Sequence, residues 1–318
     1  MTTSMLADVL EELRRTDCQS VCAWENLIDA RRAEPWRAKC PRPQKLDIGP
    51  VWDGRRGHGC EVIEVWTDDC GLGDLFMLAP AIRLAQKRAR VRLWVPQRMQ
   101  WLVDAGFFGA TVSQPLGEAA APNQVRRFEL AAYRHCSAMD LPGALGINAA
   151  AMEEERAAFR MPGFLYRDKC EGEYGRLFLG SLKCNPAYHD QGKRPTDPAT
   201  TIEALGSGWI EPYAEDRHAF DKELATAAGS FRACITVDTA IAHVAGTLGI
   251  PTVIMLHSRP NWRWGSYVGK QAICPVPWYG PNVKAVSWCG TWERTAKLAR
   301  LVAERMAPLA AELAVANG

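Results

Sequence analysis

The sequence predicts an α/β protein of two domains, each built on a largely parallel sheet. The chain has 318 residues, a length that suits two domains at roughly 100–200 residues each. Two strand–turn–helix–strand modules stand far apart, one over residues 61–95 and one over residues 233–256. Strands joined through a helix in this way lie parallel in one sheet. The Pro162-Gly163 pair between the modules indicates a break.

The first module begins with a strand over Glu61–Trp66, which is rich in β-branched and aromatic residues. Gly71 and Gly73 predict a tight turn after this strand, followed by a helix over about residues 74–88. Val91–Val95 forms the next predicted strand, at the spacing that a βαβ unit requires.

The second module has a strand over Ala233–Val237, a polar turn, a helix over Ala240–Leu248 and another strand. Gly249 directly after the helix and Pro251 shortly beyond it are typical stop signals. A final helix is predicted over about Thr291–Ala314.

The predicted organisation therefore has four parts. Residues 1–56 form a small helical appendage and a proline-rich linker, and residues 57–165 form the N-terminal α/β domain. Residues 175–290 form the C-terminal α/β domain. The last helix, within residues 291–318, is expected to pack across both domains, because its apolar positions need a partner surface.

Composition and charge exclude some classes of function. The 38 basic and 36 acidic residues leave a formal net charge of +2, so the sequence carries no footprint of a nucleic-acid binder. No apolar run approaches the ~20 residues of a membrane-spanning helix, and the first residues do not form a secretory signal. We expect a cytoplasmic protein.

The eleven cysteines predict neither a disulfide framework nor a clear metal site. Their number is odd and no CxxC pair occurs, so we expect most of them to be reduced and buried. Cys18 and Cys22 lie four residues apart on a predicted helix and could share a metal ion. No second close pair completes such a site by spacing, and we expect no metal and no cofactor.

The first candidate site is the segment Gly71–Asp74. A strand that feeds a glycine turn at a helix start lets a ligand approach the backbone closely. Phe76 occupies the position of the third glycine of a dinucleotide fingerprint, which disfavours a nicotinamide-dependent oxidoreductase. Asp74 has two readings: a helix cap, which is the ordinary role of an acid there, or a general base at a cleft.

The second candidate site lies where the strand Ala233–Val237 gives way to a helix. Asp238 and Thr239 fall at the carboxyl end of this strand, the edge at which parallel sheets bind ligands. The N–H groups of Thr239 and Ala240 would face an anion such as a diphosphate. His243 lies one helical turn further on the same face and is either a core histidine or part of this site.

Two further stretches have both a structural and a functional reading. The aromatic residues of His257–Trp264 and Pro277–Tyr279 are either core or interface side chains, or a platform for a sugar or base with Arg263 near the phosphates. The loop Asn185–Arg194 is either solvated or binds phosphate through Lys193 and its arginine neighbour.

Taken together, these stretches resemble glycosyltransferase family 9, which includes the bacterial heptosyltransferases. The likeness is closest to the members of that family that follow tetratricopeptide repeats. It extends over about residues 24–285, and its most specific part is residues 237–264. The matching segments, in chain order, are Pro50–Gly54, Gly71–Asp74, Ser181–Asp190, Val237–Pro251, Pro260–Trp264 and Trp278-Tyr279.

The resemblance implies a GT-B fold, in which two Rossmann-like domains face a cleft. It implies inverting, metal-independent transfer of a sugar, heptose being one candidate, from a nucleotide-diphosphate donor to a glycan, lipid-linked or protein acceptor. Asp74 matches the family's proposed base, with Gly71 and Gly73 at the acceptor cleft. Donor binding is expected at Asp238, Thr239, Ala240, His243, Lys193 and Arg263. The nucleotide-sugar is a substrate, and a lipid-linked acceptor would bring the protein to the inner face of the membrane.

The sequence also departs from the family pattern. Lys183-Cys184 replaces the usual Ser-Gly, and the stretch between Lys193 and Asp238 is short by about one strand and one helix. That stretch normally contacts the base and ribose, so the nucleotide stays open. The departures leave a second hypothesis, a non-catalytic protein that binds a nucleotide-sugar or a glycan on the same scaffold. The oligomeric state cannot be read from the sequence.

Overall fold

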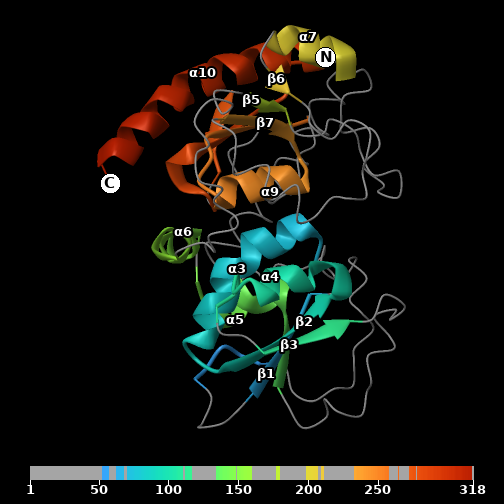
Figure 1. Ribbon diagram of the computed structural model, residues 1–318, viewed down its shortest axis with the longest axis vertical. Helices are drawn as coiled ribbons and strands as arrows, with labels where there is room; N and C mark the ends of the chain where they lie inside the picture. Colours follow the sequence, from blue (N-terminus) through green and yellow to red (C-terminus); the bar gives the residue numbers. More distant parts are fainter. Residues whose placement is uncertain are drawn as a thin grey trace, which may run out of the picture. The chain divides into compact units, whose positions relative to one another are not determined.

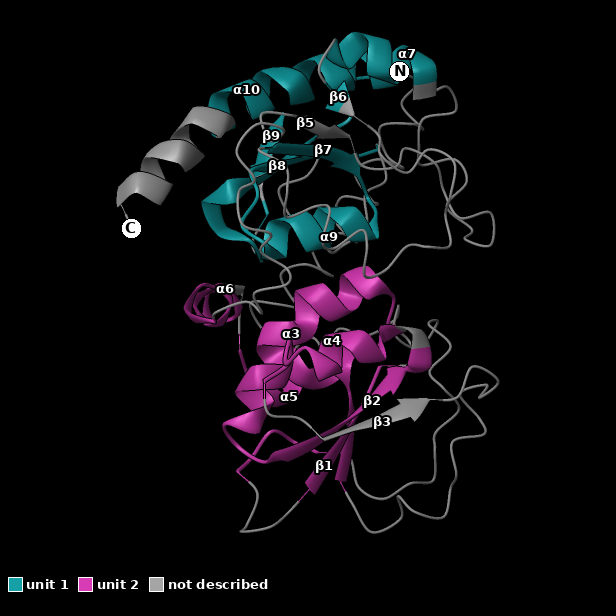
Figure 2. Ribbon diagram, viewed as in Figure 1, with its two compact units in different colours: residues 1–20, 163–318 teal, residues 21–162 magenta. Residues whose placement is uncertain are grey.

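The computed structural model describes thirteen stretches of the chain (Figure 1). They are residues 52–56, 62–67, 70–109, 112–116, 134–147, 149–159, 177–179, 198–206, 209–210, 233–257, 264, 272–276 and 278–316. The chain divides into two compact units, residues 21–162 and residues 163–318 together with 1–20 (Figure 2). We refer to them as the N-terminal unit and the C-terminal unit. The predicted appendage lies, apart from residues 52–56, outside the described residues, and so does the Cys18–Cys22 pair.

The N-terminal unit contains a four-stranded parallel sheet in the order β3-β2-β1-β4. Its strands are β1 (Val62–Trp66), β2 (Arg90–Pro96), β3 (Val112–Leu116) and β4 (Arg134–Ser137). Its helices are α3 (Leu72–Gln86), α4 (Gln100–Asp104), α5 (Leu141–Leu145) and α6 (Ala149–Ala158), with short 3-10 turns η1 (Gln97–Met99) and η2 (Ala138–Asp140).

Register and pleat give the two faces of this sheet different characters. Ile63 and Val65 on β1 are fully buried with Leu93 on β2, as expected for the face that packs on α3. The alternate positions carry Glu64 opposite Arg92, and Trp66 opposite Trp94, on the other face. The two tryptophan rings stack at 5.0 Å, and Arg92 and the Trp94 indole both donate to the buried Glu64 carboxylate.

The segment 52–56 packs closely against this unit through Trp52 and Gly54. Trp52 is fully buried, and its backbone N–H donates to the carbonyl of His135. Gly54 has φ +81°, and a Cβ there would lie 1.7 Å from the Ala144 carbonyl oxygen, so no other residue fits. The Trp-Asp-Gly part of the family resemblance therefore has a structural explanation in this chain.

The C-terminal unit contains a six-stranded sheet in the order β6-β5-β7-β8-β10-β9, in which only the pairing of β10 with β9 is antiparallel. Its strands are β5 (Leu177–Leu179), β6 (Trp209–Ile210), β7 (Ala233–Val237), β8 (Thr252–Met255), β9 (Ile273–Pro275) and β10 (Val283–Val286). Its helices are α7 (Pro198–Leu205), α9 (Ala240–Thr247) and α10 (Trp292–Ala316), with the 3-10 turn η5 (Gly280–Asn282).

Helices cover both faces of this second sheet (Figure 1). On one face, Ile235, Val237 and Met255 pack against Ala296 and Ala299 of α10 in one apolar cluster. The alternate strand residues lie on the face toward α9, which contacts β7 and β8. The described contacts of α10 are with α7, β7, β8 and β10 of its own unit, so packing across both domains stays a prediction.

The structure confirms a mixed α/β protein with parallel sheets, and the strands described form two separate sheets. The second module follows the prediction closely, with α9 ending before Gly249 at φ +73°. The first module needs a correction: α3 starts at Leu72, so Gly73 lies inside the helix. Gly71 has φ −79° and ψ 174°, an extended conformation that any residue adopts, so the tight glycine turn is absent at this position. None of the helices in the described stretches combines the length and apolar character that a bilayer crossing requires.

Candidate functional site

The candidate site lies at the carboxyl edge of the C-terminal sheet, where β7 meets α9. Every residue of β7 is buried, whereas Asp238 and Thr239 directly after it are half-buried. Thr239 is the N-cap of α9, with φ −140° and ψ 169°. Its side chain does not cap the helix, because its Oγ1 pairs with Thr236 Oγ1 at 3.1 Å. The structure thus places Asp238, Thr239 and Ala240 together at a strand end and a helix start.

The start of α9 is suited to an anion. Its first turn carries no acidic residue, and the Thr239 side chain satisfies none of its N–H groups. Such N–H groups, together with the positive end of the helix dipole, attract phosphate and carboxylate. The Ala242 N–H already donates to the Thr239 carbonyl at 3.1 Å, which leaves the earlier amides of the turn, at Ala240 and Ile241, for a ligand.

His243 is buried within an aromatic cluster of the same unit. Its Nδ1 lies 2.6 Å from Tyr279 Oη, and its ring stacks on Trp264 with centroids 4.6 Å apart. Trp264 and Tyr279 are themselves almost fully buried, as is Trp278. For these three aromatic residues the structure bears out the core reading over the ligand platform. His243 has a place in the core that needs no ligand, so its contact with a donor stays a proposal.

Gly246 explains how Tyr279 reaches His243. A Cβ at Gly246 would lie 2.8–3.0 Å from three atoms of the Tyr279 ring, closer than real Cβ contacts. The missing side chain lets the ring lie directly on α9, and its hydroxyl then meets Nδ1 of His243 one turn earlier. Gly246 of α9 is therefore a packing residue that positions an aromatic side chain.

A second aromatic group stands half-buried at the same edge of the sheet, and sequence reasoning missed two of its three members. His257 follows β8, Trp288 follows β10, and Trp292 opens α10. The His257 and Trp288 rings lie 5.0 Å apart, and Trp288 meets Trp292 edge-on at 5.1 Å. Trp288 lies two residues after β10, and its position just past an apolar strand could have identified it from the sequence as a candidate site residue.

Asp74 caps α3 in the N-terminal unit. It occupies the third helical position, and its Oδ2 accepts a hydrogen bond from the Gly71 N–H at 2.9 Å. Its side chain is half-buried and lies beyond the carboxyl end of β1. The helix-cap reading of Asp74 is therefore present in the structure, and its role as a base stays a proposal.

The remaining predicted site residues, Lys193 and Arg263, lie outside the described residues. Within the described stretches, no group of three His, Cys, Asp or Glu side chains is arranged to hold a metal ion. Of the cysteines described there, Cys70, Cys136, Cys234 and Cys274 are buried and Cys289 is half-buried, all of them as free thiols. Burial of four of these five described cysteines is as expected, and their reduced state stays a prediction.

The fold and this edge define the class: an α/β protein that presents a helix start and aromatic rings at the carboxyl ends of parallel strands. No protein-family model matches the chain, and neither does any curated protein. Among solved structures, the chain is similar to a glycosyl transferase family 9 protein from Veillonella parvula DSM 2008. The two share 11% sequence identity over 81% of this chain and 98% of the other, with a TM-score of 0.47. A likeness of this degree assigns neither a family nor an activity.

Proposed function

We propose that the protein is a glycosyltransferase that uses a nucleotide-diphosphate sugar and binds the donor at the carboxyl edge of the C-terminal sheet. The observation that carries the proposal is the uncapped start of α9 directly after β7, in the segment Val237–Pro251 that most resembles the family 9 enzymes. The diphosphate would accept hydrogen bonds from the N–H groups of Ala240 and Ile241.

The aromatic group of His257, Trp288 and Trp292 supplies the rest of the donor site in this proposal. Its rings stand at the ends of β8 and β10, and β8 is the direct neighbour of β7. Half-buried aromatic faces stack well on a nucleobase or a sugar ring. Asp238 would bind a hydroxyl of the donor, while Lys193, Arg263 and His243 are proposed to support the phosphates.

Asp74 is proposed as the general base. The acceptor hydroxyl oxygen bonds to the anomeric carbon, the bond from that carbon to the diphosphate breaks, and the hydroxyl proton passes to Asp74. The nucleoside diphosphate leaves with the electron pair, and N–H groups at a helix start stabilise its charge. This path is inverting and draws on no metal. A heptose is one candidate sugar, and a glycan, lipid-linked or protein acceptor fits the scheme.

A thermal-shift screen with nucleoside diphosphates and nucleotide-sugars tests the donor site. A ligand at 100 times its Kd stabilises the folded protein by about 2.7 kcal/mol. The sharpest variant is Ala240→Pro, because proline fits the first helical position and removes one N–H, and the extended Thr239 before it tolerates proline. Ala240→Val adds bulk but keeps the N–H. We expect Ala240→Pro alone to weaken binding, by about tenfold. Equal binding by both variants would contradict the proposal.

The alternative is a non-catalytic protein that binds a nucleotide-sugar or a glycan. The capping bond from Gly71 to Asp74 favours it, because that bond gives Asp74 a role without catalysis. Asp74→Asn separates the two functions once a donor and acceptor are identified. A base contributes about 100- to 10,000-fold, so an enzyme should lose that much turnover while its nucleotide affinity stays the same. A protein that binds nucleotide-sugars but shows no turnover with any acceptor is the binding protein.

A further inference from the structure

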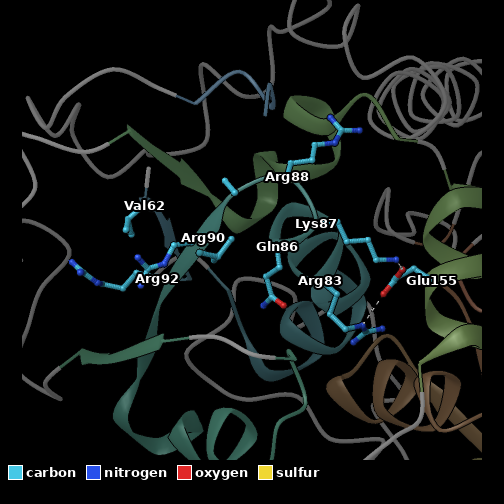
Figure 3. A pocket seen from close by; sticks show the side chains of 10 residues that line it. Val62, Arg83, Gln86, Lys87, Arg88, Arg90, Arg92 and Glu155 are labelled. Carbon is cyan, nitrogen blue, oxygen red and sulfur yellow. Dashed lines mark hydrogen bonds and ion pairs between the residues drawn. The ribbon is translucent and has the colours of Figure 1, made fainter. Parts of the chain in front are cut away.

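The N-terminal unit contains a cavity of about 670 Å³ at the amino edge of its sheet (Figure 3). Val62 and Arg90, the first residues of β1 and β2, line one side, and Arg83 and Gln86 from the last turn of α3 line another. Since α3 begins beyond the carboxyl end of β1 and runs back along the sheet, the cavity and Asp74 lie at opposite edges. The cavity is therefore separate from the proposed catalytic machinery.

Cationic side chains dominate the lining of this cavity. Five of its residues are basic, and Glu155 of α6 is the acidic residue among them. The basic residues come from the end of α3, the turn after it and alternate positions of β2, and they are Arg83, Lys87, Arg88, Arg90 and Arg92. The chain has a formal net charge of only +2, so the net charge gives no indication of this local cluster of basic residues.

The cations that line the cavity differ in their partners, and Arg83 and Lys87 turn toward Glu155 (Figure 3). Arg83 and Lys87 share the Glu155 carboxylate, and Arg92 donates to Glu64. Arg88 donates to the neutral carbonyl of Gly54 at 2.9 Å. Arg90 is exposed and forms no ion pair with any residue in the described stretches. Each guanidinium has five N–H donors, so the contacts of Arg83, Arg88 and Arg90 leave further donors on these three side chains.

One wall of the cavity is rigid. The Arg83 side chain is almost fully buried, donates to the Phe107 carbonyl at 3.1 Å and lies 3.8 Å over the Phe159 ring. Burial lowers the pKa of Arg83 to about 10, although Glu155 partly offsets this, so the guanidinium stays charged at neutral pH. The arginine is held in place before any ligand arrives, which reduces the entropy that binding costs.

We propose that this cavity binds a small compound that carries a diphosphate or two phosphate groups. Planar guanidinium groups match phosphate oxygens in pairs, and the cations are spread over too wide a cavity for one small ion. Its volume falls in the range of about 300–1,000 Å³ that is typical of small-molecule sites. Two neighbouring phosphates occur in a free diphosphate and, as adjacent headgroups, on a membrane surface that contains phosphatidic acid.

Calorimetric titration with inorganic pyrophosphate tests the proposal on the full chain. The titration uses the Ala240→Pro variant as background, because pyrophosphate could also reach the start of α9. Adding Arg90→Glu should lower the pyrophosphate affinity by about tenfold or more, the loss of a charge-assisted contact. Arg305→Glu is the matched control, because Arg305 is an exposed arginine on α10 of the other unit, and it should leave the affinity unchanged.

Sedimentation with phosphatidic acid vesicles distinguishes the two sources of phosphate. Vesicle binding that Arg90→Glu abolishes, in the absence of pyrophosphate binding, identifies a lipid headgroup as the ligand. Pyrophosphate binding that Arg90→Glu abolishes identifies a free compound. Absence of both, or equal losses in Arg90→Glu and Arg305→Glu, overturns the proposal. These results do not depend on the comparison of Ala240→Pro with Ala240→Val. The cavity proposal can therefore be wrong while the proposed donor site is right, and the donor site can be wrong while the cavity proposal is right.

Discussion

Replacing Glu155 by glutamine should destabilise the N-terminal unit strongly. The Arg83 and Glu155 side chains are 7% and 10% exposed, and the Arg83 Nε lies 3.4 Å from a Glu155 oxygen. Removal of one partner from a buried ion pair costs about 3–5 kcal/mol, because the remaining charge stays buried. Here glutamine keeps one oxygen acceptor, and Arg83 keeps the Phe107 carbonyl and the Phe159 ring. We therefore expect a loss of about 2–3 kcal/mol, below that range.

Two controls isolate the buried pair. Glu154→Gln removes an exposed carboxylate from the same helix and should change the free energy of unfolding by less than about 0.5 kcal/mol. Lys87→Met removes the other partner of Glu155. The Lys87 side chain is 64% exposed, so its loss should lower the free energy of unfolding by under about 1 kcal/mol. Urea unfolding measures the three differences, and hydrogen exchange of α3 amides assigns them to this unit. A Glu155→Gln loss no larger than that of Glu154→Gln would refute the reasoning.

Three further predictions concern other buried groups. Burial raises the pKa of Glu64 above its ordinary 4.5, although hydrogen bonds from Trp94 and Arg92 partly oppose this. The stability that protonation of Glu64 contributes is present below pH 4.5 and is lost as the pH rises through the raised pKa. Urea unfolding should therefore show the free energy of unfolding of the wild type falling, relative to that of Glu64→Gln, over this rise in pH. Gly246→Ala should lower the thermal stability. The added Cβ would lie 2.8 Å from the buried Tyr279 ring, which places the overpacking cost in the upper part of about 1–3 kcal/mol, above the helix gain of about 1 kcal/mol. An unchanged or higher Tm would refute it. Burial raises the pKa of the Cys234 thiol, so peptide mapping after iodoacetamide should find half-buried Cys289 alkylated before Cys234, and the reverse order would contradict the burial argument.

Local signals predicted the second module well. The β-branched run at Ala233–Val237, the polar pair after it, and the Gly249 and Pro251 stop signals act over a few residues, and the chain follows them. In the first module the glycines were misleading. Gly71 was expected to need a turn, yet it has an ordinary extended backbone. Gly73 lies inside α3, whose start is capped by the Asp74 carboxylate.

Long-range contacts lay beyond sequence reasoning. The meeting of His243 with Tyr279 spans 36 residues and depends on the space at Gly246. The basic cavity depends on the parallel register of β1 and β2, which brings Val62 beside Arg90 and directs Arg90 and Arg92 to the same face. Neither contact has a signal in the local spacing of residues, because both follow from how strands and helices pack.

The most direct test of the central claim is an amide NMR titration with a nucleoside diphosphate. A diphosphate bound at the start of α9 should shift the Ala240 and Ile241 amide resonances, and both should saturate together. The Ala240→Pro variant should lose this response, whereas Ala240→Val should keep it. Saturable shifts confined to other parts of the chain, with Ala240 and Ile241 unmoved, would contradict the assignment of this edge as the donor site.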